Sequence, residues 1–364
     1  MAENAVRVAI VGVGNCASAL VQTIDHYGRS QDATPPPGLI LDDVGGYRAG
    51  DIRVVAGFDV NAEKVGADIS EAIFSAPNNT FRFARPAASG VIVQRGPTLD
   101  GIGEYLRDVV HLSDAEPVDV AQVLRDSGAQ VLVNFLPVGS QLASEHYLDA
   151  ALAAGCAVVN CIPVFAASDK KWAQRFTDAG LPIIGDDIKS QVGATILHRT
   201  LVKLLQDRGI QLQRTSQLNV GGNTDFQNML ERSRLTSKKI SKTRAVTSLM
   251  DIALPESDVH VGPSDFVPWL EDRKWAHIRL EGTGVGGAPL NIEVKLEVWD
   301  SPNSAAVVVD AIRCARLALD RGDAGPIAAA SAYYMKSPPV QYDDEAARVL
   351  LEAYISGTDR QAPR

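Results

Sequence analysis

Cysteine and histidine are scarce in this sequence, and neither type occurs at the spacing of a metal site. The 364 residues include four cysteines, Cys16, Cys156, Cys161 and Cys314, and no CxxC pair. They stand in apolar or helical stretches, which favours free thiols in a reducing compartment over disulfides. The six histidines show no HxxxH or HExxH spacing, so a histidine-based zinc site is not expected.

Long apolar runs and an excess of basic residues are also missing. No stretch reaches the roughly 18 apolar residues of a membrane span. The first residues contain no basic region of the kind that opens a secretory signal. The formal net charge of -9 argues against a general nucleic-acid binder, whose domain would be basic. We therefore expect a cytoplasmic protein that has neither a membrane nor a nucleic acid as a partner.

Short apolar runs that alternate with helical patterns fill the first half of the chain. Apolar, β-branched runs stand at 6–12, 51–60, 90–96, 130–137, 156–163 and 181–187. A helical pattern follows each run, including one over 61–74 after the second. Strands that alternate with crossover helices predict an α/β fold with a Rossmann-like, doubly wound parallel sheet.

The pattern changes from residue 210, and a second domain is expected to begin near 190. Longer alternating segments at 210–220, 274–283 and 289–300 predict a mainly antiparallel sheet with helices on one face. From Ser301 the pattern is helical again, and the tail from 325 is expected to return to the first sheet. The proline-rich stretch 28–50 is interpreted as a long surface insertion.

A dinucleotide-binding turn is expected after the first predicted strand. Gly12-Val13-Gly14-Asn15-Cys16-Ala17 reads GxGxxA between that strand and a helix. Gly12 would allow a tight turn, Gly14 would let the backbone approach a pyrophosphate, and Ala17 would let the helix pack closely. Asn15 belongs to the same candidate cofactor site. The alternative is a turn and a packing contact without a ligand.

Three further residues belong to the predicted cofactor site. Asp59 ends the second strand, where an acid binds ribose hydroxyls, and the absence of an adjacent arginine favours NAD over NADP. Its distance from the glycines is about twice the roughly 20 residues expected, which the 28–50 insertion would explain. Asn134 and Pro137 follow a later strand, where a loop beside the nicotinamide would lie. A plain strand-to-helix turn is an equally good interpretation there.

A second polar site is expected at 185–195, GDDIKSQVGAT. Two carboxylates, a lysine and a serine stand at the carboxyl end of a strand, where open α/β sheets bind ligands. The amides of the helix that begins there suit a phosphate, helped by the hydroxyls of Ser190 and Thr195. The alternative is helix capping by Asp187 and Ser190.

A basic cluster stands out at 231–244, ERSRLTSKKISKTR. Lys238 and Lys242 are four residues apart and would share a helical face. Like charges at that spacing suggest an anionic partner, although a solvated face would explain them too. Upstream, NVGGNTDF at 219–226 contains a turn that carries Asp225.

Five motifs together resemble the myo-inositol-1-phosphate synthase family in its shorter prokaryotic form. They are GDDIKSQVGAT, LNVGGNTDF, SKKISKT, LEVWDSPNSA and AYYMKSPP, in that order along nearly the whole chain. The resemblance implies isomerisation of D-glucose 6-phosphate to 1L-myo-inositol 1-phosphate, which is also named 1D-myo-inositol 3-phosphate, with NAD regenerated in each turnover. It also implies a homotetramer. The Rossmann domain, 1–190, would be interrupted by a catalytic and oligomerisation domain, 191–300, and completed by the segment 301–364.

The resemblance also implies roles for individual residues. Lys238 would transfer the proton at C5 in company with Asp225, and Lys242 would bind the phosphate. Lys274 and Lys336 would stabilise the enolate and the C1 oxyanion. The remaining candidates near substrate and cofactor are Asp187, Ser190, Thr195 and Asp300. The family's longer members read KSGQT where this chain reads KSQVGAT, so the amides and hydroxyls that hold the phosphate are left open.

A cation near the nicotinamide is a further implication of the resemblance. Asp300 and Ser301 offer oxygens that could hold a divalent metal such as zinc, or a monovalent ion. The alternative for Asp300 is capping of the helix that follows, in which Pro302 stands just inside the start.

Two other functions remain open from sequence. One is a net NAD-dependent dehydrogenase of the homoserine or amino-acid type, which would consume one NAD per turnover. The other is a non-catalytic NAD sensor or nucleic-acid binder that uses the basic cluster. The lysines stand in three distant motifs and not in one stripe, which argues against the second alternative.

Overall fold

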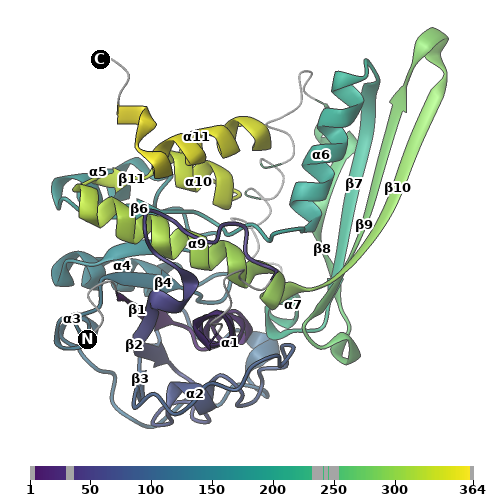
Figure 1. Ribbon diagram of the computed structural model, residues 1–364. Coiled ribbons are helices and arrows are strands. Elements are labelled where there is room, and N and C mark those ends of the chain that lie inside the picture. The colour runs from purple at the N-terminus through teal and green to yellow at the C-terminus, as the bar shows by residue number, and fades with distance from the viewer. Residues whose placement is uncertain (1–4, 30–36, 232–240, 242–244, 246–253, 361–364) are drawn as a thin grey trace.

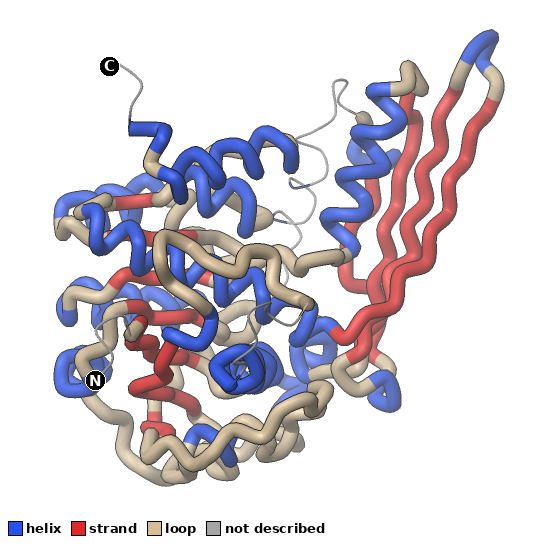
Figure 2. The backbone as a smooth tube through the Cα atoms, viewed as in Figure 1, coloured by secondary structure: helices blue, strands red, loops and turns tan. Residues whose placement is uncertain are grey.

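The computed structural model describes residues 5–29, 37–231, 241, 245 and 254–360. Two sheets lie side by side, and helices pack on both (Figure 1). Figure 2 shows that the strands of the second sheet are much longer than those of the first. The predicted α/β class is confirmed.

The first sheet has seven strands in the order β11-β6-β5-β4-β1-β2-β3. Every neighbouring pair in it is parallel. The strands are β1 (Val6–Val11), β2 (Ile52–Asp59), β3 (Val93–Arg95), β4 (Val131–Asn134), β5 (Ala157–Asn160), β6 (Pro182–Ile184) and β11 (Gly325–Pro326). This order, with β1 next to β4, is the doubly wound arrangement that the alternation predicts.

Helices cover both faces of the first sheet, because side chains alternate along each strand. In β1, Val8 and Ile10 belong to one hydrophobic core, and Ala9 and Val11 belong to the other. The first core includes side chains of α1 (Asn15–Arg29), α2 (Ile69–Ala72), α9 (Asp300–Arg321), α10 (Ala328–Tyr334) and α11 (Asp344–Ser356). The second core includes side chains of α3 (Val120–Ser127), α4 (Gln141–Ala154) and α5 (Lys170–Asp178).

The second sheet has four strands in the order β10-β9-β7-β8. They are β7 (Gln211–Gly221), β8 (Val259–Phe266), β9 (Arg273–Thr283) and β10 (Pro289–Trp299). β9 is antiparallel to β7 and to β10, whereas β7 and β8 are parallel, so the sheet is mainly antiparallel as expected. Helix α6 (Ala194–Asp207) covers one face (Figure 1). β8 was not predicted from the sequence.

After β10 the chain goes back to the first sheet. Helix α9 packs into its core, and β11 pairs with β6. The tail from 325 therefore returns as expected.

The stretch 28–50 is not only a surface insertion. In its described part, Val44 and Tyr47 are buried in the first core beside α9. The buried guanidinium of Arg313 on α9 donates to the carbonyl oxygens of Leu41 (2.7 Å) and Tyr47 (3.1 Å). This segment therefore covers α9 because it supplies both apolar side chains and acceptors for a buried cation.

The helix predicted over 61–74 is much shorter than expected, since only Ile69–Ala72 is helical. The side-chain oxygen of Asn61 accepts a hydrogen bond from the Glu63 amide (3.0 Å), which favours a turn over a helix. Gly66 has φ 87, a conformation that ends helices.

His198 lies in the interface between α6 and the second sheet. Its side chain is fully buried, with Nδ1 3.1 Å from Gln217 Oε1 and Nε2 2.6 Å from Thr215 Oγ1. Burial lowers the pKa of His198 to about 4. The imidazole is therefore neutral at pH 7, where it links helix and sheet as a donor and an acceptor.

Because His198 is buried in its neutral form, the free energy of unfolding should fall as pH falls. We expect His198→Gln to make this pH dependence smaller. An unfolded histidine has a pKa of about 6.5, so as pH falls from about 6.5 to 4 the unfolded chain takes up a proton that the folded chain refuses. The contribution is intact above that range, and about 3 kcal/mol of it is lost across the range. Urea unfolding of wild type and variant at pH 7.5 and pH 4.5, at one protein concentration, measures the difference between them. Equal pH dependence in both proteins would contradict the prediction.

All four cysteines lie in the described part of the chain and are unpaired. Within the described ranges, no helix combines the length and apolar character that crossing a membrane requires.

Candidate active site

The turn between β1 and α1 has the form that the GxGxxA motif predicts. Gly12 has φ 84, and its amide donates to the Phe58 carbonyl (2.8 Å). A Cβ on Gly14 would meet no atom within 4 Å, so the backbone there faces open space. Ala17 is fully buried in the first core, as expected for the residue that lets the helix pack closely. The first-turn amides of α1 have no intrahelical partner.

Asp59 lies directly beside this turn. Its Oδ2 accepts from the Val13 amide (2.7 Å), and its Oδ1 accepts from the amides of Val60 (2.7 Å) and Asn61 (2.8 Å). The carboxylate therefore fixes the glycine turn. A carboxylate has about four acceptor positions, so one remains for a ligand hydroxyl.

Lys64 is a component of this turn that sequence reasoning missed. It is almost fully buried, and its Nζ donates to the Val13 carbonyl (2.8 Å) and to Asn78 Oδ1 (2.9 Å). Burial lowers its pKa, whereas the nearby charge of Asp59 opposes that shift. In the sequence, Lys64 looks like any lysine on a helix face, and only the tertiary contact reveals it.

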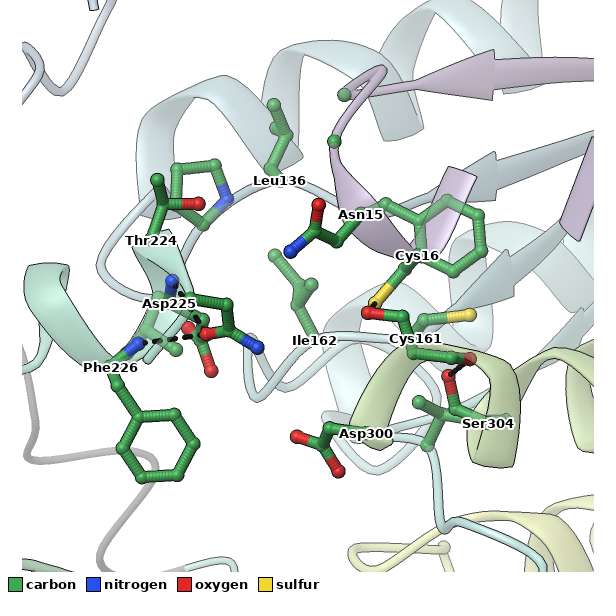
Figure 3. Close-up of a pocket in the computed structure, with 18 of the residues that line it drawn as sticks. Asn15, Cys16, Leu136, Cys161, Ile162, Thr224, Asp225, Phe226, Asp300 and Ser304 are labelled. Atoms are coloured by element: carbon green, nitrogen blue, oxygen red, sulfur yellow. Dashed lines mark hydrogen bonds between the residues drawn. The ribbon is translucent and has the colours of Figure 1, made fainter. Parts of the chain in front are cut away.

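One cavity joins the glycine turn to the second polar site. Its volume is about 320 Å³. Asn15 from α1, Asp225 from α7 (Thr224–Asn228) and Asp300 from α9 face the same space in Figure 3. The predicted site residues that line it are Gly12, Gly14, Asn15, Asp59, Pro137, Asp187, Ser190, Thr195, Asp225, Lys274, Asp300, Ser301 and Lys336.

Asp187 brings two distant segments together at the end of β6. Its Oδ1 accepts from Lys336 Nζ (2.9 Å), and its Oδ2 accepts from Ser241 Oγ (2.6 Å). The backbone of this loop also pairs with the segment around Lys336, whose amide donates to the Asp187 carbonyl (2.7 Å). Asp187 has φ 62, which is uncommon for a residue other than glycine and marks a conformation that its surroundings enforce.

The neighbouring polar residues of this loop point away from the cavity. Asp186 is fully buried and accepts from the amides of Ala166 and Ser168 (both 3.0 Å), and burial raises its pKa. Lys189 donates to Asp344 Oδ1 (3.2 Å) and is almost fully buried, so its pKa falls to about 8. Of the four polar residues that the sequence groups here, only Asp187 and Ser190 therefore face the cavity.

Lys274 and Asp300 form an ion pair on another wall of the cavity. Lys274 lies at the start of β9 and Asp300 begins α9, and the lysine donates directly to the carboxylate. The capping alternative for Asp300 is wrong, because the N-cap of α9 is Trp299. The Asp300 carboxylate holds a lysine in the cavity.

Helix α6 begins beside the loop that carries Asp187. It begins at Ala194 after Gly193, which supplies no side-chain cap, so capping by Asp187 or Ser190 is wrong. Ser190 and Thr195 both line the cavity. The amides of Gln191 and Val192 donate to Asn303. The first-turn amides of α6 have no intrahelical partner, so they are available to a ligand.

Asn134 and Pro137 have different surroundings. Pro137 lines the cavity, whereas Asn134 is buried beneath it. Asn134 Nδ2 donates to Asn160 Oδ1 (3.0 Å) and Ser144 Oγ (3.2 Å), and its Oδ1 accepts from the Leu136 amide (3.1 Å). Asn134 therefore shapes the loop and does not face the cavity.

Comparison with known proteins agrees with this arrangement. A protein named inositol-3-phosphate synthase from Mycobacterium tuberculosis is 60% identical over 98% of this chain and 97% of its own length. Its namesakes from Mycolicibacterium smegmatis and Corynebacterium glutamicum are 59% and 56% identical, over 98% of this chain and 100% and 99% of their own lengths. The profile described as Myo-inositol-1-phosphate synthase matches residues 193–301.

The chain belongs to the myo-inositol-1-phosphate synthase family. Among solved structures, Ari2 is 33% identical with a TM-score of 0.78, covering 98% of this chain and 99% of that one. The inositol-3-phosphate synthase of Caenorhabditis elegans shares the fold with a TM-score of 0.77 at 16% identity, over 97% of this chain and 85% of its own. The resemblance seen in five motifs is thereby confirmed.

Two of the lysines expected from the family lie outside the described residues. These are Lys238 and Lys242, and no contact can be assigned to either. Ser241, which directly precedes Lys242, is described, and its hydroxyl donates to Asp187.

Asp225 is oriented by a cap that the sequence signals correctly as a turn. Asn223 is the N-cap of α7, and its Oδ1 accepts from the amides of Asp225 (3.1 Å) and Phe226 (3.2 Å). This cap directs the first turn of α7, with Asp225, at the cavity.

Asp272 is a second residue that sequence reasoning missed. It is fully buried between the start of β9 and the start of α9. Burial raises its pKa to about 6, and the charge of Asp300 adds to that shift. Nothing in the local sequence distinguishes it from a surface acid in a loop.

Asp300 and Ser301, which were predicted to hold a cation, both have protein partners in this arrangement. Asp300 is paired with Lys274, and Ser301 Oγ donates to Asp272 Oδ1 (2.9 Å). Across the described ranges, no cluster of three or more His, Cys, Asp or Glu side chains is placed to hold an ion. These donors therefore form no cluster of the carboxylate or imidazole type among the described residues, and the cation expected at Asp300 and Ser301 stays a prediction.

Proposed function

We propose that this chain converts D-glucose 6-phosphate to 1L-myo-inositol 1-phosphate (1D-myo-inositol 3-phosphate), with NAD reduced and reoxidised in each turnover. The observation that supports the proposal is a single cavity lined both by the glycine turn after β1 and by residues to which the family resemblance assigns a role. Asp187, Lys274 and Lys336 come from three distant segments, and all line that cavity.

The glycine turn fits a dinucleotide. Gly14 leaves its backbone open to the cavity, and the first-turn amides of α1 would bind the pyrophosphate. Asp59 would accept from a ribose hydroxyl, and Asn15 lines the cavity at the start of the same helix. Bound NAD would supply a hydride acceptor and donor at C5 of the substrate.

Lys336 and Lys274 are proposed to stabilise negative charge as the ring closes. Oxidation at C5 acidifies the C6 proton, and the aldol addition of C6 to C1 creates charge on an enolate oxygen and then on the C1 oxygen. Each lysine is held in the cavity by a carboxylate, Asp187 or Asp300, so its ammonium group is positioned before the charge develops.

The remaining proposed roles are phosphate binding and proton transfer at C5. The first turn of α6, with Ser190 and Thr195, would bind the phosphate together with Lys242. Lys238 and Asp225 are proposed to transfer the proton at C5.

We also propose a cytoplasmic homotetramer, in which each subunit consists of the units 1–190, 191–300 and 301–364. The exposed apolar side chain of Leu218, on the face of the second sheet opposite His198, supports an interface there.

The stoichiometry of NAD tests the proposal. Incubation with excess glucose 6-phosphate and NAD at a small fraction of that concentration should give inositol phosphate in many-fold excess over NAD, identified by NMR, without accumulation of NADH. A net dehydrogenase would instead stop after one turnover per NAD. Formation of NADH in step with product, or no inositol phosphate at all, would overturn the proposed function.

A further inference from the structure

The carboxylate of Asp272 joins four separate segments of the chain. Its Oδ1 accepts from Asn15 Nδ2 (3.2 Å), Asn223 Nδ2 (2.9 Å) and Ser301 Oγ (2.9 Å). Its Oδ2 accepts from Thr80 Oγ1 (2.6 Å) and from the Ser301 amide (3.2 Å). These five donors fill the acceptor capacity of a carboxylate.

The two asparagine partners cannot turn their amide groups around. Asn15 Oδ1 accepts from the Asn79 amide (2.8 Å), and its Nδ2 also donates to Asn79 Oδ1 (2.7 Å). Asn223 Oδ1 is occupied as the cap of α7. Each asparagine therefore presents only N–H groups to position 272, and only an acceptor can satisfy both.

Asp272 also holds the start of α9. The residue before this helix, Trp299, supplies no side-chain cap, while the Ser301 amide donates to the Asp272 carboxylate and the Asp300 amide donates to its carbonyl (2.9 Å). A negative charge at the N-terminus of a helix of 22 residues is favourable. Asp300 in turn pairs with Lys274, which follows Asp272 by two residues.

We propose that Asp272 is a positioning residue of this site, which holds Asn15 on the dinucleotide side and the Lys274–Asp300 pair on the substrate side in one arrangement. Asp272 does not itself line the cavity, so it acts through these neighbours. The inference rests on the proposed function, because it assigns the dinucleotide to Asn15 and the substrate to Lys274.

Asp272→Asn tests the inference with almost no change of shape. Whichever way the new amide turns, its NH₂ meets either the two asparagine amides or the Ser301 amide, so a donor faces a donor. The Kd for NAD, measured by calorimetry, should rise about tenfold, the size expected for one lost hydrogen bond to a charged group. At saturating NAD, kcat should fall by about a hundredfold, because Lys274 is displaced.

A double-mutant cycle separates positioning from general damage. Asn15→Ala should weaken NAD binding, and the double variant Asp272→Asn/Asn15→Ala should bind NAD no more weakly than the weaker single variant. Additive losses in the double variant, or wild-type NAD affinity in Asp272→Asn, would overturn the inference.

Asp310→Asn is the matched control. Asp310 is also a fully buried carboxylate, but it lies within α9 and pairs with Arg313 instead of a cavity residue. The variant should lose thermal stability and keep the wild-type Kd for NAD and kcat. A loss of NAD affinity equal to that of Asp272→Asn would overturn the inference, because general destabilisation would then explain both.

The wild-type protein in the same assays distinguishes failure of the proposed function from failure of the inference about Asp272. If wild type neither binds NAD nor forms inositol phosphate, the proposed function fails and the inference fails with it. If wild type does both and Asp272→Asn matches it, only the inference fails.

Discussion

Lys336→Met should abolish inositol phosphate formation and leave NAD binding intact. Methionine has nearly the length of lysine but carries no charge, so the cavity keeps its shape and loses a cation. Removing one preorganised charge-stabilising group costs about 10² to 10³ in kcat. Since Lys336 also holds Asp187, we expect a loss at or above the upper end of that range. Product formation by NMR and NAD affinity by calorimetry measure the two effects.

A single-turnover experiment locates the step that Lys336→Met blocks. If Lys336 stabilises the enolate or the C1 oxyanion, oxidation at C5 still proceeds in the variant. Enzyme-bound NADH should then accumulate when enzyme and NAD are equimolar, which ultraviolet absorbance detects. Lys203→Met is the control, because Lys203 lies exposed on α6, pairs with Asp207 and does not line the cavity. Near-normal turnover in Lys336→Met would refute the role proposed for this lysine.

Gly12→Ala should destabilise the first sheet and remove NAD binding. A Cβ on Gly12 would lie 2.9 Å from the Phe135 carbonyl oxygen and 3.3 Å from the Leu136 amide nitrogen. The backbone there cannot easily move, because the Phe135 amide donates to Val11 (2.8 Å). Together with the positive φ, this predicts a loss of about 3 kcal/mol in the free energy of unfolding. Denaturant unfolding measures it.

Gly14→Ala is the matched variant on the same turn. Its Cβ would meet nothing within 4 Å, so the free energy of unfolding should stay near that of wild type. The new methyl group would enter the space proposed for the pyrophosphate, and NAD affinity should fall. Wild-type affinity in Gly14→Ala would mean that the pyrophosphate does not lie on this turn.

The sequence predicts the first sheet well because its strands are short, buried and apolar. The run at 130–137 contains β4, and the run at 156–163 contains β5. The helix prediction fails at 61–74, because the Asn61 side chain and Gly66 form turns inside an amphipathic pattern. The sequence also misses β8, in which Gly262 and Pro263 weaken the strand signal and pairing with β7 supplies the stability.

The residues of the site also fall into two groups, those that the sequence predicts and those that it misses. The GxGxxA turn and Asp59 follow from local rules, and the lysines follow from the family resemblance. Asp272 and Lys64 could not be predicted, because a charged residue in a loop or on a predicted helix face is normally solvated. Only the folded chain surrounds Asp272 with donors from four segments and buries Lys64 against the Val13 carbonyl.

The junction between β10 and α9 has a mechanical consequence. The strand ends at Trp299 and the helix begins at Asp300, with no linker residue between them. The strand belongs to the second sheet and the helix to the core of the first. A hinge rotation of one sheet against the other at this point would break the hydrogen bonds that Asp272 makes to Asp300 and Ser301. These hydrogen bonds therefore oppose such a rotation, and Asp300 stands at the point where the two sheets are joined.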